Sequence, residues 1–280
     1  ASVMNAMPAS PLFRSLALAA AALALAAALG GCATSGSKTG MDDAVSAGLI
    51  TPDNETDARR RARTRLALAA SYFENGQTAV ALSELKQVLQ IDPTFPDAYN
   101  LSGLIYMSLG DMPMASAQLQ RALSLNPRDS NTLHNLGWMY CQQKNYEQAS
   151  QMFDRAVSNP LYPERAKTLM TKGICEARAG DRTKAEATLL KAYELDPGNP
   201  ITGYNLSQLL FLRGDLERAR FYIRRLNNSE LGNAESLWLG IKIERQLGHT
   251  EAVLQLADQL RRRYPSSSQL VSYERGRFNE

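Results

Sequence analysis

Glycine recurs in this chain at one fixed spacing. The glycines of the series are Gly76, Gly110, Gly180, Gly214 and Gly248. They are separated by 34, 70, 34 and 34 residues, and Asn145 is predicted to occupy the one missing position. A period of this length is typical of arrays whose unit is a helix–turn–helix that cannot bury its own apolar face. The spacing therefore predicts an all-α superhelix of stacked units, a fold that presents a groove to a partner.

The series divides the chain into six units of two helices each. The units are predicted to begin near Ala62, Pro96, Ser130, Ala166, Pro200 and Ala234. Prolines, which stop helices, are expected to end four of the second helices, at Pro93, Pro127, Pro197 and Pro265. Each member of the series then lies just past a first helix, where a left-handed backbone is favourable for glycine or asparagine.

A small residue at the eighth position of each first helix would let two helices approach closely. That position holds Ala69, Gly103, Gly137, Gly173 and Ser207, and the sixth unit departs from the pattern with Ile241. Together these positions resemble tetratricopeptide repeats (TPR). The resemblance implies a six-repeat TPR domain over residues 58–265, followed by a C-terminal cap or tail over residues 266–280.

The third unit is two residues longer than the others and contains Pro160 and Pro163, which predicts a wider turn before the fourth unit. Cys141 and Cys175 fall at nearly the same place on the first helices of these two units. Adjacent units stack these helices side by side, and the bacterial periplasm is oxidising. We therefore expect a disulfide that pins the irregular turn, with two buried thiols as the alternative.

The N-terminal segment has the features of an export signal. Arg14 precedes an apolar stretch from Leu16 to Leu29, which is too short to span a membrane and ends in the sequence LGGC. Small residues before a cysteine resemble the bacterial lipobox, in which the cysteine is lipidated and becomes the new N-terminus. The prediction is a lipoprotein signal peptide over residues 1–31 with Cys32 as the lipidation site; an ordinary signal peptide with an incidental cysteine is the alternative.

The residues after Cys32 indicate where such a lipoprotein would go. Ala33, rather than aspartate, follows the cysteine, which by resemblance to Gram-negative lipoproteins favours the outer membrane. Residues 32–57 are small and polar and are predicted to form a lipidated, flexible tether. The membrane would thus be a partner through the N-terminal lipid, with the folded domain on the periplasmic face.

Composition and motifs argue against catalysis and against nucleic-acid binding. The formal net charge of the 280 residues is only +3, without the basic stripe that nucleic acid requires. The two histidines, His134 and His249, lie in different units, and no HExxH, CxxC, GxSxG or P-loop pattern is present. We expect no enzyme activity, no cofactor and no metal.

The concave surface of a TPR array comes mainly from positions 2, 5, 9, 12 and 13 of each first helix. Here these positions are unusually apolar, and exposed apolar patches mark interaction sites. An extended or helical apolar peptide is expected to fit better than an acidic tail; the alternative is that some of these side chains fill the superhelix interior. The predicted partner-binding groove comprises Phe73, Asn100, Leu104, Met107, Asn131, His134, Trp138, Met170 and Phe211.

A more specific resemblance covers the lipobox and residues 66–264. The stretch LGWMYCQQKNYEQASQMFDRAVSNPLYPERAKTLMTKGICEARAGD, and later AESLWLGIKIERQLG, look like the type IV pilus biogenesis/stability lipoproteins of the PilF/PilW type. The resemblance implies a pilotin, probing as a single array a partner subunit on the inner leaflet of the outer membrane. Its expected partner is the pilus secretin, whose localisation and multimerisation it would promote. An envelope adaptor lipoprotein that recruits cell-wall enzymes is the alternative.

Overall fold

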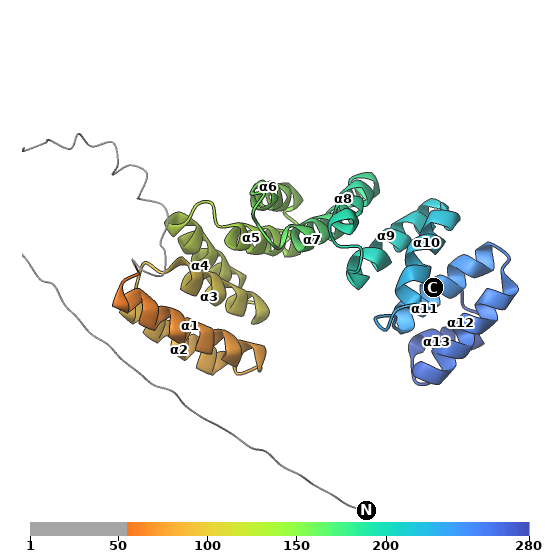
Figure 1. Ribbon diagram of the computed structural model, residues 1–280, viewed down its shortest axis with the longest axis horizontal. Helices are drawn as coiled ribbons and strands as arrows, with labels where there is room; N and C mark the ends of the chain where they lie inside the picture. The colour runs from red at the N-terminus through yellow and green to blue at the C-terminus, as the bar shows by residue number, and fades with distance from the viewer. Residues whose placement is uncertain (1–54, 280) are drawn as a thin grey trace, which may run out of the picture. The chain divides into compact units, whose positions relative to one another are not determined.

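A computed structural model describes residues 55–279 of the chain; the predicted signal peptide, Cys32 and most of the predicted tether lie outside the described residues. The described residues form helices and no strands. The helices, shown in Figure 1, are α1 (Asp57–Glu74), α2 (Thr78–Ile91), α3 (Pro96–Ser108), α4 (Met112–Leu125), α5 (Ser130–Gln142), α6 (Tyr146–Val157), α7 (Arg165–Arg178), α8 (Arg182–Leu195), α9 (Pro200–Arg213), α10 (Leu216–Asn227), α11 (Ala234–Gln246), α12 (Thr250–Arg263) and α13 (Ser268–Glu274).

The helix boundaries follow the predicted units closely. The first helices of units two to six begin at the predicted residue or one residue before it. The first unit differs, because α1 begins at Asp57 rather than Ala62, with the Thr56 side chain accepting a hydrogen bond from the Arg59 backbone as its N-cap. Helices α2, α4, α8 and α12 each end two residues before a proline, as expected from the restriction that proline places on the residue before it.

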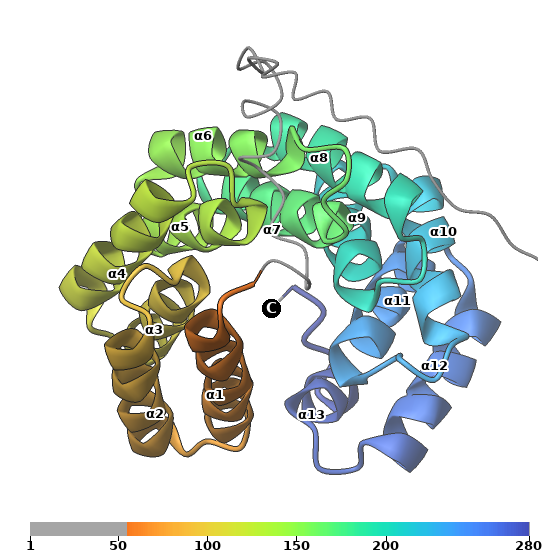
Figure 2. The same ribbon diagram turned by 60° about the vertical axis from the view of Figure 1, so that its left-hand side comes forward.

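The paired helices form two layers within the described residues. Each odd-numbered helix from α1 to α9 contacts the next odd-numbered helix, whereas no two even-numbered helices of the described chain contact each other. Helices that lie closer together form the inside of a curve. The odd-numbered helices therefore line the concave side, and the even-numbered helices α2 to α12 form the outer layer (Figure 2).

Close approach within each hairpin explains the small residues. A Cβ atom added at Gly103, Gly137 or Gly173 would lie 2.5–2.7 Å from a side-chain atom of the paired helix, closer than real Cβ atoms come. In the sixth unit the close approach is displaced by one residue to Gly240, where an added Cβ would lie 2.8 Å from Asn227 Nδ2. This displacement explains why Ile241 occupies the eighth position there.

The prediction for Asn145 is wrong. Asn145 has φ −87° and is the N-cap residue of α6, while the left-handed backbone belongs to Lys144, with φ 62°. Lys144 lies 34 residues after Gly110, so it occupies the regular position, and the two extra residues of the third unit come after it. The chain reversal after α5 fixes the backbone conformation at this position, and its Lys144 N–H donates to the Cys141 carbonyl at 3.0 Å.

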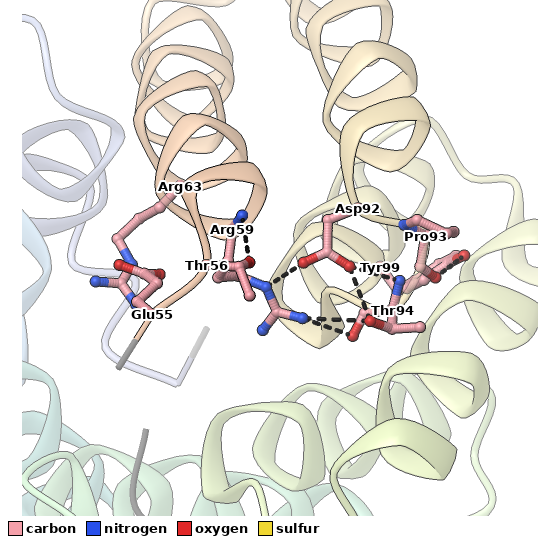
Figure 3. A network of polar contacts seen from close by, with 8 residues as sticks. All are labelled: Glu55, Thr56, Arg59, Arg63, Asp92, Pro93, Thr94 and Tyr99. Carbon is pink, nitrogen blue, oxygen red and sulfur yellow. Dashed lines mark hydrogen bonds and ion pairs between the residues drawn. The ribbon is translucent and has the colours of Figure 1, made fainter. Parts of the chain in front are cut away.

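The two ends of the array are closed differently. At the first unit, the Arg59 guanidinium forms an ion pair with Asp92, donates to the Thr94 carbonyl at 3.3 Å and lies 4.6 Å from the centre of the Phe95 ring (Figure 3). These contacts join the start of α1 to the turn between α2 and α3. Burial by itself raises the pKa of Asp92, but hydrogen bonds from Arg59 and Thr94 outweigh it and hold that pKa below its usual value.

At the last unit, the segment after Pro265 forms α13, which contacts α11 and α12. Its Leu270 is 5% exposed and joins the apolar cluster around Leu237 and Ile241. Phe278 stacks on Trp238 with a distance of 5.4 Å between the ring centres. The short helix thus covers the apolar face that a seventh unit would otherwise bury.

Candidate partner-binding face

The concave side is less exposed at its apolar positions than the sequence indicates. Met107 and Met170 are 8% and 9% exposed. Met107 packs with Leu136 and Met139, and Met170 belongs to the cluster that contains Leu206. The prediction that these two methionines lie in an exposed patch is wrong, because neighbouring first helices close over them.

The other predicted apolar residues are half-buried, and two of the rings are covered by cations. Phe73 and Leu104 pack on the apolar clusters of the first and second units. The Arg178 guanidinium lies 5.0 Å from the centre of the Trp138 ring, and Lys242 Nζ lies 5.8 Å from that of Phe211. The face is therefore a surface of cations over aromatic rings in its C-terminal half, rather than the purely apolar patch that was predicted.

Two aromatic residues of this arrangement escaped the sequence analysis. Lys242 Nζ also lies 5.7 Å from the centre of the Trp238 ring, and the Arg245 guanidinium lies 3.9 Å from that of Phe278. Trp238 lies 34 residues after Tyr204, at the fifth position of the sixth unit. Extending the list of groove positions to the sixth unit would have found Trp238 and Lys242.

The predicted polar residues of the groove bond to neighbouring helices. Asn100 Oδ1 accepts from Asn135 Nδ2 at 2.9 Å, joining α3 to α5. Asn131 Oδ1 accepts from the Tyr162 hydroxyl at 3.2 Å. His134 Nδ1 lies 2.8 Å from Thr168 Oγ1, joining α5 to α7. These contacts position the helices, so Asn100 and His134 in particular carry less of the expected binding to a partner backbone.

His134 is held neutral by its surroundings. Burial lowers the pKa of its imidazole to about 4, and the positive charge of Lys167 lowers it further. The ring also meets the edge of Phe153 with 5.9 Å between ring centres. A histidine with this pKa is uncharged near neutral pH, in keeping with a structural role in the wall of the concave side.

Cys141 and Cys175 form a disulfide in the structure, with their Cα atoms 5.9 Å apart. Both side chains are buried, and they connect α5 directly to α7. The bond therefore joins two adjacent inner helices across the longest connection between units, residues 158–164.

The outer layer has one defined pocket beside this disulfide. Its volume is about 380 Å³, and it lies between α6, α7 and α8 with Tyr146, Phe153 and Cys175 among its lining residues. Lys172 pairs there with Asp154 and, at 3.7 Å, with Glu176. Because these charges are satisfied by one another, the concave face remains the stronger candidate for binding.

Two searches of the described residues complete the survey. None of the helices from α1 to α13 is both long and apolar enough to cross a bilayer. Residues 55–279 also contain no group of three or more histidine, cysteine, aspartate or glutamate side chains placed to hold a metal ion.

Comparison with known proteins agrees with this architecture. Models of the TPR repeat match residues 69–110, and models of the tetratricopeptide repeat match residues 95–160 and 134–200. The type IV pilus assembly protein PilF of Pseudomonas aeruginosa is 27% identical over 256 residues, which cover 91% of this chain and 97% of that protein.

Solved structures show the same relationship. The chain matches Pseudomonas aeruginosa PilF with a TM-score of 0.70 and 26% identity, over 78% of this chain and 99% of that one. It matches PilW, described as a widely conserved type IV pilus biogenesis factor, with a TM-score of 0.68 and 28% identity, over 76% and 97% of the two chains. A match to the TPR protein YrrB, at 16% identity and a TM-score of 0.54 over 68% and 97%, shows the fold alone.

Proposed function

We propose, from the premise that this chain belongs to the tetratricopeptide-repeat family, that it is a binding scaffold for the assembly of type IV pili. The observation that carries the proposal is the similarity to PilF, which extends over 97% of that protein's length. A partial match would be expected from shared repeats alone, whereas this one runs through the irregular third unit as well. PilW, a second pilus biogenesis factor, matches at a similar level.

We propose further that the partner is the pilus secretin and that the chain holds unassembled secretin subunits through its concave face. A lipid on Cys32 would give the scaffold its address at the periplasmic face of the outer membrane. The concave layer α1 to α11 would supply the contact, because it presents side chains from successive units along one continuous surface. Localisation and multimerisation of the secretin would both follow from this pairing.

The test of function is a deletion of the gene in the bacterium that carries it. Heat-resistant secretin multimers in the outer membrane and surface pili are scored together, with the wild-type gene restored as the control. Loss of both supports the proposal. Normal multimers with normal pili reject it, and normal multimers without pili reject the secretin as partner and favour an adaptor role elsewhere in assembly.

The test of the anchor is the Cys32→Ala variant in the same strain. Labelled palmitate should enter the wild-type protein and not the variant, and the variant should leave the outer-membrane fraction. The Cys141→Ala variant is the matched control, because it removes a different cysteine and should keep the label. Equal labelling of wild type and Cys32→Ala would contradict lipidation at Cys32.

A further inference from the structure

The charges of the concave face are distributed unevenly along the array. Its N-terminal part carries the carboxylates Glu74 and Asp97, and burial, with the nearby charge of Asp129, raises the pKa of Asp97. Its C-terminal part, on α7 and α11, carries the cations Lys167, Arg178, Lys242 and Arg245, with Glu235 as the acidic residue among them. The C-terminal half of the face is therefore net positive.

The arginines of this half differ from most arginines of the outer layer. Arg213 and Arg218 pair with Glu186, and Arg220 pairs with Glu244. The contacts described for Arg178 and Arg245 are instead with the rings of Trp138 and Phe278. A guanidinium that lies over a ring keeps its N–H groups at its edge, where they can donate to a carboxylate.

The rings also fix the positions of these cations before any partner binds. Arg178 lies over Trp138 from the unit before it, and Lys242 lies between the rings of Phe211 and Trp238. A side chain held in this way loses less conformational freedom when it binds than a free one does. Burial lowers the pKa of Lys242, which shows that this ammonium group is partly removed from water.

From this arrangement we infer that the C-terminal half of the concave face binds an acidic amphipathic segment of its partner. The apolar side chains of the segment pack on Trp138 and Phe211, and its carboxylates pair with Arg178, Lys242 and Arg245. Charge complementarity selects this occupant, since a basic segment would meet four cations on the same surface. The inference deepens the proposed function and rests on it for the identity of the partner, but its chemistry can be tested separately.

The position of the two tryptophans supplies the measurement. The chain contains only two, and both Trp138 and Trp238 lie beneath a cation on this face. Intrinsic fluorescence of the full chain therefore reports the proposed site directly. The probe is a synthetic peptide of alternating leucine and glutamate, and the matched probe has lysine in place of every glutamate.

We expect saturable quenching or a spectral shift with the glutamate peptide and none with the lysine peptide. Arg178→Gln should weaken binding roughly tenfold, the loss expected for one charge-assisted pair. Arg182→Gln is the matched control, because it removes the same charge from the exposed start of α8 in the outer layer. Far-ultraviolet circular dichroism confirms that each variant is folded.

The outcomes separate this inference from the proposed function. Equal binding of the two peptides, or equal loss in Arg178→Gln and Arg182→Gln, overturns the inference. Selective binding of the glutamate peptide supports it even where the deletion strain keeps normal secretin multimers, a result that would reject only the secretin as partner. Loss of multimers in that strain without selective peptide binding would reject only the acidic segment.

Discussion

The connection between α4 and α5 and the connection between α6 and α7 solve the same problem in different ways. The first spans residues 126–129, stops α4 near Pro127 and begins α5 with the Asp129 carboxylate accepting from the Thr132 N–H at 2.7 Å. The second spans residues 158–164, and Glu164 makes no side-chain cap for α7. The regular connection is thus set by its own short sequence.

The longer connection is compensated by direct links between the inner helices. The disulfide and the contact between His134 and Thr168 both join α5 to α7, and buried Tyr162 donates from the connection to Asn131 on α5. Between α3 and α5 the corresponding polar link is the pair of Asn100 and Asn135. The difference teaches that an insertion can be accommodated in a TPR array when neighbouring first helices are fastened to each other.

Removal of the disulfide should break this comparison most strongly. The Cys141→Ala/Cys175→Ala variant should lose about 4 kcal/mol of the free energy of unfolding, because the bond closes a loop across 34 residues. Urea unfolding followed by circular dichroism measures the loss. Reductant should destabilise the wild type by a similar amount and leave the double variant unchanged; a loss below about 1 kcal/mol would show that packing alone holds the connection.

Acid should weaken the irregular connection next. The pKa of His134 is about 4 in the folded chain against 6.5 for the ordinary group, so the unfolded chain binds the proton more readily. Stability is therefore lost as pH falls below 6.5, by about 2 kcal/mol between pH 7 and pH 5. The neighbouring groups are Lys167, Thr168 and Tyr162. Urea unfolding at both pH values should show a smaller change in His134→Gln, and an equal change would contradict the assignment.

The hairpins inside the two units should respond alike, which sharpens the comparison to the connections. Gly103→Ala and Gly137→Ala should each cost about 1.5 kcal/mol, because the new methyl group meets Leu119 or Phe153. Gly203→Ala is the control, since an added Cβ there has no neighbour within 4 Å and alanine favours helix. Thermal unfolding would contradict this view if Gly137→Ala were as stable as Gly203→Ala.

Exchange at the ladder position should give the smallest effect. Lys144→Gly should stabilise the third unit by up to about 1 kcal/mol, because glycine adopts the left-handed backbone without steric cost. Gly110→Lys should destabilise the second unit by a similar amount at the equivalent φ of 77°. Chemical unfolding of both variants measures the pair, and a loss of stability in Lys144→Gly would mean that the lysine side chain makes a contact worth more than the strain.

The sequence predicted the fold well because its signals are local. Prolines, turn glycines and small crossing residues act within one unit, and five of six unit starts agree with the helices to within one residue. Asn145 was misplaced because residue preference outweighed the count of 34 from Gly110. The candidate site was predicted less well. Burial of Met107 and the placement of Arg178 over Trp138 depend on how two successive units pack, which no single unit's sequence specifies.

The Arg59 contacts at the start of α1 have a mechanical consequence. Tension applied to the chain ahead of residue 55 would enter the array at this end of α1 and tend to peel that helix away from α2. The ion pair with Asp92 and the contact with Phe95 stand at the point where the load arrives, and they pass it on to the turn that leads into α3. A pull on the N-terminal end is thereby shared between two units before α1 can detach.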